Sequence, residues 1–298
     1  MAKDSVKTKP KAKDTEARNV PEVLMRFTTL TRLFEMIELN GIPLGNGAGW
    51  DDQVDRAFVD CARRRLNAKR CGVLCFMDCN HPVKGQDEEL DQTEYVLRRE
   101  TVAHWKAYGS PGDFAIRIEF DGGEISRALG KLSESENMNP AFRKWFEPVK
   151  YRSLKECREL AENKSNDEEL FFAKRYAYEW EHECRMVILN QTPVSPMERK
   201  GVEAFVKLDL KKAIKTVVFS PFVKPCPAWC GTPGVECLRR FALKCFEEWG
   251  NLERREAVRE TLEILLGKNQ SHRSRVLDND SLLKACDAST PKCLYCKA

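Results

Sequence analysis

A charged run late in the chain has the composition of a catalytic or binding site. Residues 181–185 read Glu-His-Glu-Cys-Arg. If residues 180–189 form a strand, Glu181, Glu183 and Arg185 share one face, because side chains alternate along a strand. Both faces then also carry apolar residues, so the charged triplet is expected to line a cleft. Crowded carboxylates raise each other's pKa and Arg185 opposes that effect, so the group is suited to hold one poised acid or base.

A helical conformation of the same run predicts no function. On a helix, Glu181 and Arg185 form an i,i+4 ion pair that only stabilises the surface. Lys174, just before the run, is either a phosphate contact or an ion-pair partner of Glu181. The sequence leaves these alternatives open.

Aromatic and histidine residues form a second candidate group. In His104-Trp105-x-x-Tyr108, Trp105 and Tyr108 lie on one face of a predicted helix. Such a pair is typical of core packing, and it also suits a platform for a ligand ring. His104 and His182 are a candidate acid–base pair, or two hydrogen-bonded structural histidines.

Cysteine is the next candidate chemistry, with 13 residues in the chain. The count is odd and no secretory h-region is present at the start, which predicts mostly free thiols in a reducing compartment, the cytoplasm. Two CxxC knuckles at zinc-finger spacing are absent, and no Cys-His motif supports a nucleophile. The remaining candidates for a zinc site, which we do not expect, are Cys226, Cys230, Cys293 and Cys296.

Composition excludes several function classes. The chain has 298 residues, a net charge of +4 and 42% hydrophobic residues. No apolar stretch is long enough for a membrane helix. The charge is too small for a nucleic-acid footprint by itself, and the basic run at 63–65 is expected to be the solvated face of a helix. The lysine-rich residues 1–20 are predicted to be a disordered tail, which could touch nucleic acid or simply be solvated.

The elements that must position these residues indicate an α+β fold. Alternation is clearest at 114–120, and further strands are predicted at 22–27, 71–77, 149–152, 184–189, 204–208 and 216–219. Helices are predicted at 29–39, ending at Asn40-Gly41, and at 167–178, with Asp121-Gly122-Gly123 as a turn. Because irregular stretches separate the strands, we expect one mixed, mostly antiparallel sheet flanked by helices.

Three regions follow from this layout. Residues 1–20 are the basic tail, residues 21–222 form the α+β core domain, and residues 223–298 form a cysteine-containing helical extension with a loose C-terminal tail. The extension contains two amphipathic helices, the second at 252–266.

The order of several segments resembles a bacterial family catalogued as domain of unknown function 2971. The resemblance covers residues 22–222, and its most specific part is Glu-x-Glu-x-Arg at 181–185 after Lys174. Other matching segments are 23–27, 50–52, 74–76, 104–108, 118–120, 149–151 and 217–219. Tyr178 stands where the family usually has Trp, and Asp51-Asp52 where it usually has Asn-Asp.

That family has no established activity, but its layout is similar to the ADP-ribosyltransferase fold. This similarity implies an enzyme that uses NAD, in an effector or defence role. Glu183 would grip the nicotinamide ribose, and Glu181 would activate a protein or nucleic-acid acceptor. Arg26 would bind the phosphates, Tyr108 or Trp105 would stack on the ring, and Lys174 and Arg185 would complete the site. The alternative is a non-enzymatic module that binds a nucleotide or a protein in the same cleft.

Overall fold

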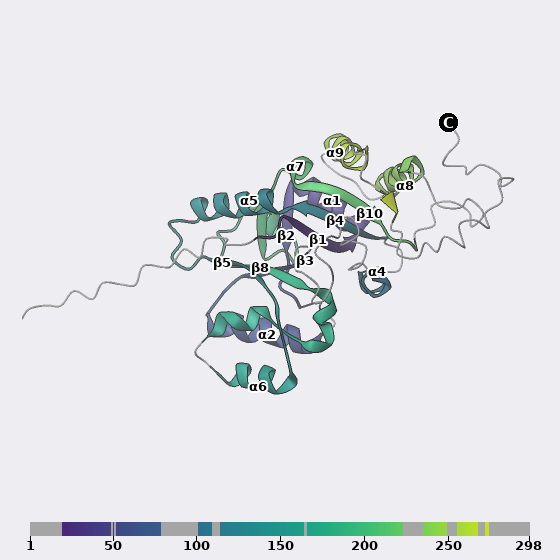
Figure 1. Cartoon of the computed structure of the whole chain (residues 1–298). Coiled ribbons are helices and arrows are strands. Elements are labelled where there is room, and N and C mark those ends of the chain that lie inside the picture. Colours follow the sequence, from purple (N-terminus) through teal and green to yellow (C-terminus); the bar gives the residue numbers. More distant parts are fainter. Residues whose placement is uncertain are drawn as a thin grey trace, which may run out of the picture.

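A seven-stranded sheet lies at the centre of the molecule (Figure 1). The computed structural model describes residues 20–48, 50, 52–78, 101–108, 114–163, 166–222, 235–248, 255–267 and 272–273. The strand order is β11–β10–β4–β1–β3–β8–β5, antiparallel throughout except for the parallel pair β10–β11. The predicted α+β class is confirmed. The seven strands are β1 (Val23–Thr29), β3 (Cys71–Asp78), β4 (Ala115–Asp121), β5 (Arg143–Pro148), β8 (Glu183–Leu189), β10 (Ile214–Phe219) and β11 (His272–Arg273).

Two small sheets and the helices surround this sheet. In the small sheets, β2 (Gly41–Leu44) pairs with β9 (Ala204–Lys207), and β6 (Lys150–Arg152) pairs with β7 (Ala173–Arg175). The α-helices are α1 (Leu30–Leu39), α2 (Gln53–Arg65), α4 (Val102–Tyr108), α5 (Gly122–Ser135), α6 (Leu154–Glu162), α7 (Leu210–Ala213), α8 (Val235–Glu248) and α9 (Arg255–Gly267). The 3₁₀ helices are η1 (Asp167–Phe172), η2 (Tyr176–Glu181) and η3 (Ser195–Glu198). No helix in these ranges is long and apolar enough to cross a bilayer.

One face of the sheet carries the largest hydrophobic core. Helices α1, α5, α7, α8 and α9 cover it, and Figure 1 shows α5, α7, α8 and α9 together above the sheet. Ile118 and Met186 point to this side from their strands, and Phe246 and Leu262 pack on it from α8 and α9. The two helices of the predicted C-terminal extension therefore share the core of the sheet.

The opposite face carries two separate, smaller clusters. Helices α2 and α6 with η1 pack over one end of the sheet, where Phe58 and Phe171 meet Val187. Helix α4 packs over the other end, where Trp105 meets Phe27 and neighbouring strand residues. Figure 1 shows α2 and α6 below the sheet and α4 apart from them. The space between these two clusters is where the polar residues gather.

Two predicted elements are wrong. The predicted helix at 167–178 is instead η1, β7 and η2. Leu170, Phe171 and Phe172 are all buried in succession, so this run has no single apolar face and cannot be an amphipathic helix. The predicted turn after β4 is the start of α5, because the Asp121 side chain accepts a hydrogen bond from the Glu124 N–H and caps that helix. Other predicted elements are present within a few residues, and α1 ends at Asn40 in the left-handed region, with φ 53°.

We expect opposite effects from two glycines of α5. A Cβ on Gly122 would overlap the carbonyl oxygen of Pro21, so Gly122→Ala should lower the free energy of unfolding by about 1–3 kcal/mol through overpacking. A Cβ on Gly130 meets nothing within 4 Å, so Gly130→Ala should raise it by about 0.5–1 kcal/mol through helix propensity. Urea denaturation of both variants checks this, and equal effects would contradict the close approach of α5 to the start of β1.

Candidate functional site

Two central strands separate along part of their length. Strands β1 and β3 pair at Leu24↔Asp78 and Met25↔Met77. On its other side, β1 pairs with β4 along its whole length. Beyond Met25 the separation is bridged by the Arg26 side chain, whose Nη1 donates to the carbonyl oxygen of Cys75 at 2.7 Å. This opening in the ladder provides space for a ligand within the sheet face that α2 and α4 flank.

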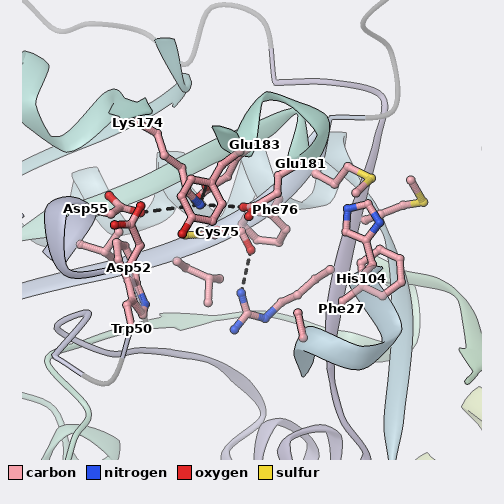
Figure 2. A pocket seen from close by; sticks show the side chains of 17 residues that line it. Phe27, Trp50, Asp52, Asp55, Cys75, Phe76, His104, Lys174, Glu181 and Glu183 are labelled. Atoms are coloured by element: carbon pink, nitrogen blue, oxygen red, sulfur yellow. Dashed lines mark hydrogen bonds and ion pairs between the residues drawn. The ribbon is translucent and has the colours of Figure 1, made fainter. Parts of the chain in front are cut away.

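A cavity of about 380 Å³ lies at this opening. Figure 2 shows its lining, with Trp50, Asp52 and Asp55 near one end and Phe27 and His104 near the other. Pockets of this size accommodate small organic ligands. The charged lining residues are Arg26, Asp52, Asp55, Lys174, Glu181 and Glu183.

A network of buried charges forms one wall of the cavity. Arg185, which is fully buried, donates through Nε to Glu183 Oε1 at 2.8 Å. Its two terminal nitrogens donate to the Asp55 carboxylate at 2.7 and 2.6 Å. Lys174 Nζ donates to Glu183 at 2.9 Å and to Glu181 at 2.6 Å. We call these five residues the charge cluster. Each buried charge in it has an oppositely charged partner, as burial requires.

The local structure explains how the charge cluster forms. Glu183 and Arg185 alternate on β8 and face the side of α2 and η1, while Cys184 and Met186 face the main core. The charged face of β8 predicted from the sequence is therefore present from Glu183 onwards. Glu181 lies outside the strand, at the end of η2, and His182 with φ 42° turns the chain from η2 into β8. The helical alternative for this run is wrong.

Burial and pairing together set the protonation of the charge cluster. Burial raises the pKa of Glu181, and Lys174 only partly opposes it. Burial also disfavours ionisation of Glu183, but Arg185 and Lys174 outweigh it and hold the pKa of Glu183 at about 2. The pKa of Lys174 is raised despite its burial, because Glu183 and Glu181 favour the charged form. Lys174 is therefore a fixed cation, and Glu181 is the carboxylate closest to a proton-transfer role.

A second ion pair and two aromatic rings extend the wall. Arg175 donates to Asp52 Oδ1 at 2.9 Å, and the same oxygen caps α2 by accepting from the Val54 N–H. The Tyr178 ring lies 4.9 Å from Lys174 Nζ, and the Trp50 ring lies 5.0 Å from the Arg185 guanidinium carbon. Trp50 and Tyr178 are half-buried and line the cavity, so they offer apolar faces beside the charges.

His104 forms the opposite end of the cavity. Its ring stacks on Phe27 with centroids 4.7 Å apart and meets Trp180 edge-on. The Thr101 N–H lies 3.2 Å from His104 Nδ1 and donates to it. Burial lowers the pKa of His104 to about 4, with smaller contributions from His182 and Arg117. His104 is therefore a neutral histidine at neutral pH.

We expect this histidine to make stability depend on pH. In the unfolded chain it binds a proton below its ordinary pKa of 6.5, whereas the folded protein resists protonation down to about 4. The free energy of unfolding should thus fall as pH drops from about 6.5 to 4, by at most about 3 kcal/mol for this group. Urea denaturation of the wild type and of His104→Gln across that pH range checks this prediction. The variant has every other titrating group, so its free energy of unfolding should fall less between pH 6.5 and about pH 4. Parallel curves for the two proteins would contradict the buried neutral histidine.

The structure places the residues predicted for the site in different surroundings. Arg26, Lys174, Glu181 and Glu183 line the cavity, and Arg185 lies directly behind Glu183. Lys174 is an ion-pair partner of Glu181, one of the two roles left open for it.

The predicted aromatic platform is not part of the described lining. Trp105 is 1% exposed and packs edge-on against Phe27 in the core, 4.9 Å between centroids. Tyr108 ends α4, and its side chain lies outside the described residues. So do the four cysteines of the zinc alternative, Cys226, Cys230, Cys293 and Cys296.

Sequence reasoning missed several residues of the site. Asp55 accepts two hydrogen bonds from Arg185, and its signal was available in the sequence. It is an acidic residue on the apolar face of α2, beside Phe58 and Val59. Tyr151 accepts a hydrogen bond from the Glu183 N–H at 2.7 Å. Cys75 faces Glu183, and burial raises the pKa of its thiol well above the usual range, so it is a structural thiol.

Neither metal-binding groups nor comparisons with known proteins assign a function to the site. Among the described residues, no group of three or more His, Cys, Asp or Glu side chains is placed to hold a metal ion. Comparisons with protein-family models, with curated proteins and with solved structures find no match to this chain.

Proposed function

We propose that the chain is an NAD-using enzyme that transfers ADP-ribose to an acceptor. The observation that carries this proposal is the cavity of about 380 Å³ between β1 and β3, with its combination of wall residues. Arg26 suits a phosphate group, the apolar faces of Trp50 and Tyr178 suit the face of a ribose, and Glu181 suits a ribose hydroxyl. The proposal follows the expectation drawn from the sequence resemblance.

The proposed reaction exchanges the group on the anomeric carbon and moves one proton. The bond between the anomeric carbon of the ribose and the nicotinamide nitrogen breaks, and nicotinamide leaves with the bonding electrons. A nucleophilic atom of the acceptor forms the new bond to the anomeric carbon, and its proton moves to the Glu181 carboxylate. Positive charge developing on the ribose is stabilised by the excess of carboxylates over cations in the charge cluster.

The two glutamates divide the work differently from the sequence-based hypothesis. Glu183 is the more deeply buried, and its oxygens already accept bonds from Lys174 and Arg185. The Glu181 side chain is 15% exposed, and Lys174 is its single ion-pair partner among the described residues. We therefore assign proton transfer and contact with the ribose to Glu181, and the positioning of Lys174 and Arg185 to Glu183.

A non-enzymatic binding module is the second candidate. The observation that favours it is the saturation of the charge cluster, in which Arg185 donates to Glu183, Asp55 and the Phe171 carbonyl. A cavity wall whose charged side chains are paired with one another can bind a ligand without taking part in a reaction. In this alternative a nucleotide or a protein partner occupies the same cavity. For both candidates we propose a cytoplasmic setting, which suits the reduced thiols of Cys61, Cys71, Cys75 and Cys157.

Turnover and binding separate the two candidates. The full chain is incubated with NAD labelled in the adenine, with and without a bacterial lysate, and nicotinamide release, label transfer and NAD binding are measured in parallel. The enzyme predicts release and transfer. Binding without release would support the module, and absence of both would overturn the enzyme and the nucleotide-binding form of the module. Glu256→Gln, an exposed change on α9, should behave as wild type.

A further inference from the structure

Two buried polar atoms at opposite ends of the cavity lack a hydrogen-bond partner in the described part of the chain. His104 is 2% exposed and its Nε2 has none, and the Asp52 side chain is 7% exposed and its Oδ2 has none. Both residues line the cavity, and Figure 2 shows them at its two ends. Buried polar atoms are almost always paired in proteins, so each atom offers a position at which a ligand atom would complete the pairing.

The His104 atom is a donor without charge. Nδ1 lies 3.2 Å from the Thr101 N–H and 2.9 Å from the Thr101 hydroxyl oxygen. Because a backbone N–H can only donate, we assign Nδ1 as the acceptor and place the proton of the neutral ring on Nε2. Burial keeps the ring neutral by lowering its pKa to about 4. The matching ligand atom is therefore an acceptor, and an uncharged donor suits a carbonyl oxygen rather than a phosphate.

The Asp52 atom is an acceptor. Its other oxygen, Oδ1, is occupied by the Arg175 guanidinium and by the Val54 N–H at the start of α2. These two contacts fix the carboxylate and leave Oδ2 to be matched by a hydrogen-bond donor. A hydroxyl or amino group of a ligand satisfies that requirement.

Building on the proposed function, we infer that the cavity holds the nicotinamide riboside half of NAD in a single direction. The carboxamide oxygen accepts from His104 Nε2–H at the end near α4. A ribose hydroxyl donates to Asp52 Oδ2 at the end near α2. Figure 2 places Glu181 and Glu183 between these ends, where the bond from ribose to nicotinamide then lies. The ligand class is a nucleoside whose ring carries an uncharged carbonyl group.

Variants of the two residues test the direction with nicotinamide mononucleotide as the probe. His104→Asn keeps an acceptor near the Nδ1 position and loses the Nε2 donor. The dissociation constant of its complex with nicotinamide mononucleotide should therefore be about tenfold or more above that of the wild type. His104→Gln keeps a donor near the Nε2 position and should stay within about threefold of wild type. Asp52→Asn retains the oxygen that caps α2 and replaces the other oxygen by a donor, so it should also weaken binding about tenfold.

Ligand analogues show whether these contacts are direct. An analogue with methyl in place of the carboxamide should bind the wild type about tenfold more weakly, and His104→Asn should weaken it no further. The 2′,3′-dideoxy analogue lacks the ribose hydroxyls. It should bind the wild type about tenfold more weakly than the probe, and Asp52→Asn should weaken its binding no further. If each variant weakens probe and analogue by equal factors, the residues act only structurally and the inference is overturned. If NAD is consumed while the mononucleotide does not bind, this inference alone fails. If neither ligand binds, the proposed function fails with it.

Discussion

Replacing Arg185 by methionine should lower the free energy of unfolding by about 3–5 kcal/mol, the largest stability effect that we expect of any single substitution. Arg185 is fully buried and bonds both Asp55 and Glu183. Without its guanidinium, two carboxylates remain buried, and Lys174 is the one cation of the charge cluster left to oppose their charge. That uncompensated charge, rather than the lost contacts themselves, is the source of the effect.

Urea denaturation of full-chain variants measures this effect. Arg32→Met is the matched control, because the Arg32 side chain is 66% exposed and forms a surface ion pair with Glu35, so the same change should cost less than about 0.5 kcal/mol. Replacing Asp55, Glu183 and Arg185 together by leucine, methionine and methionine should recover much of the loss, since no unpaired charge then remains among them. A loss below about 1 kcal/mol in Arg185→Met would show that the charge cluster does not support the fold.

Glu181→Gln should reduce the rate of nicotinamide release about 100-fold or more and leave stability nearly unchanged. The amide oxygen of glutamine can still accept from Lys174, so the ion-pair partner that Glu181 has in the described part of the chain keeps a hydrogen bond. The glutamine side chain cannot take up the proton that the acceptor loses. Burial raises the pKa of Glu181, which brings this carboxyl closer to the working pH of a general base.

Two neighbouring glutamates are the controls for that result. Glu179→Gln changes an exposed residue of the same 3₁₀ helix and should keep the wild-type rate. Glu183→Gln should instead lower the free energy of unfolding, by roughly 2–4 kcal/mol, because Lys174 and Arg185 lose a charged partner. Release rates and urea curves are measured for all three variants. A wild-type rate in Glu181→Gln would remove Glu181 from the reaction.

Local patterns in the sequence determined much of the fold. The alternation at 114–120 gave β4, and the helical spacing before Asn40 gave α1 with its end. The charged face of β8 followed from alternation as well, because one face of that strand packs on the main core and the other on η1 and α2. These features depend on residues close together in the chain, so periodicity is sufficient to find them.

Only the tertiary structure decided the composition of the site. The Asp55 contact with Arg185 spans 130 residues, and the Arg26 contact with the Cys75 carbonyl exists because β1 and β3 separate after two paired positions. Lys174 reaches Glu181 and Glu183 from a short strand, where the sequence predicted a helix. Residue types and their spacing in the sequence therefore determined which charged side chains could line a cleft. Which charges meet, and which polar atoms remain to be matched by a ligand, depends on long-range packing that no local pattern encodes.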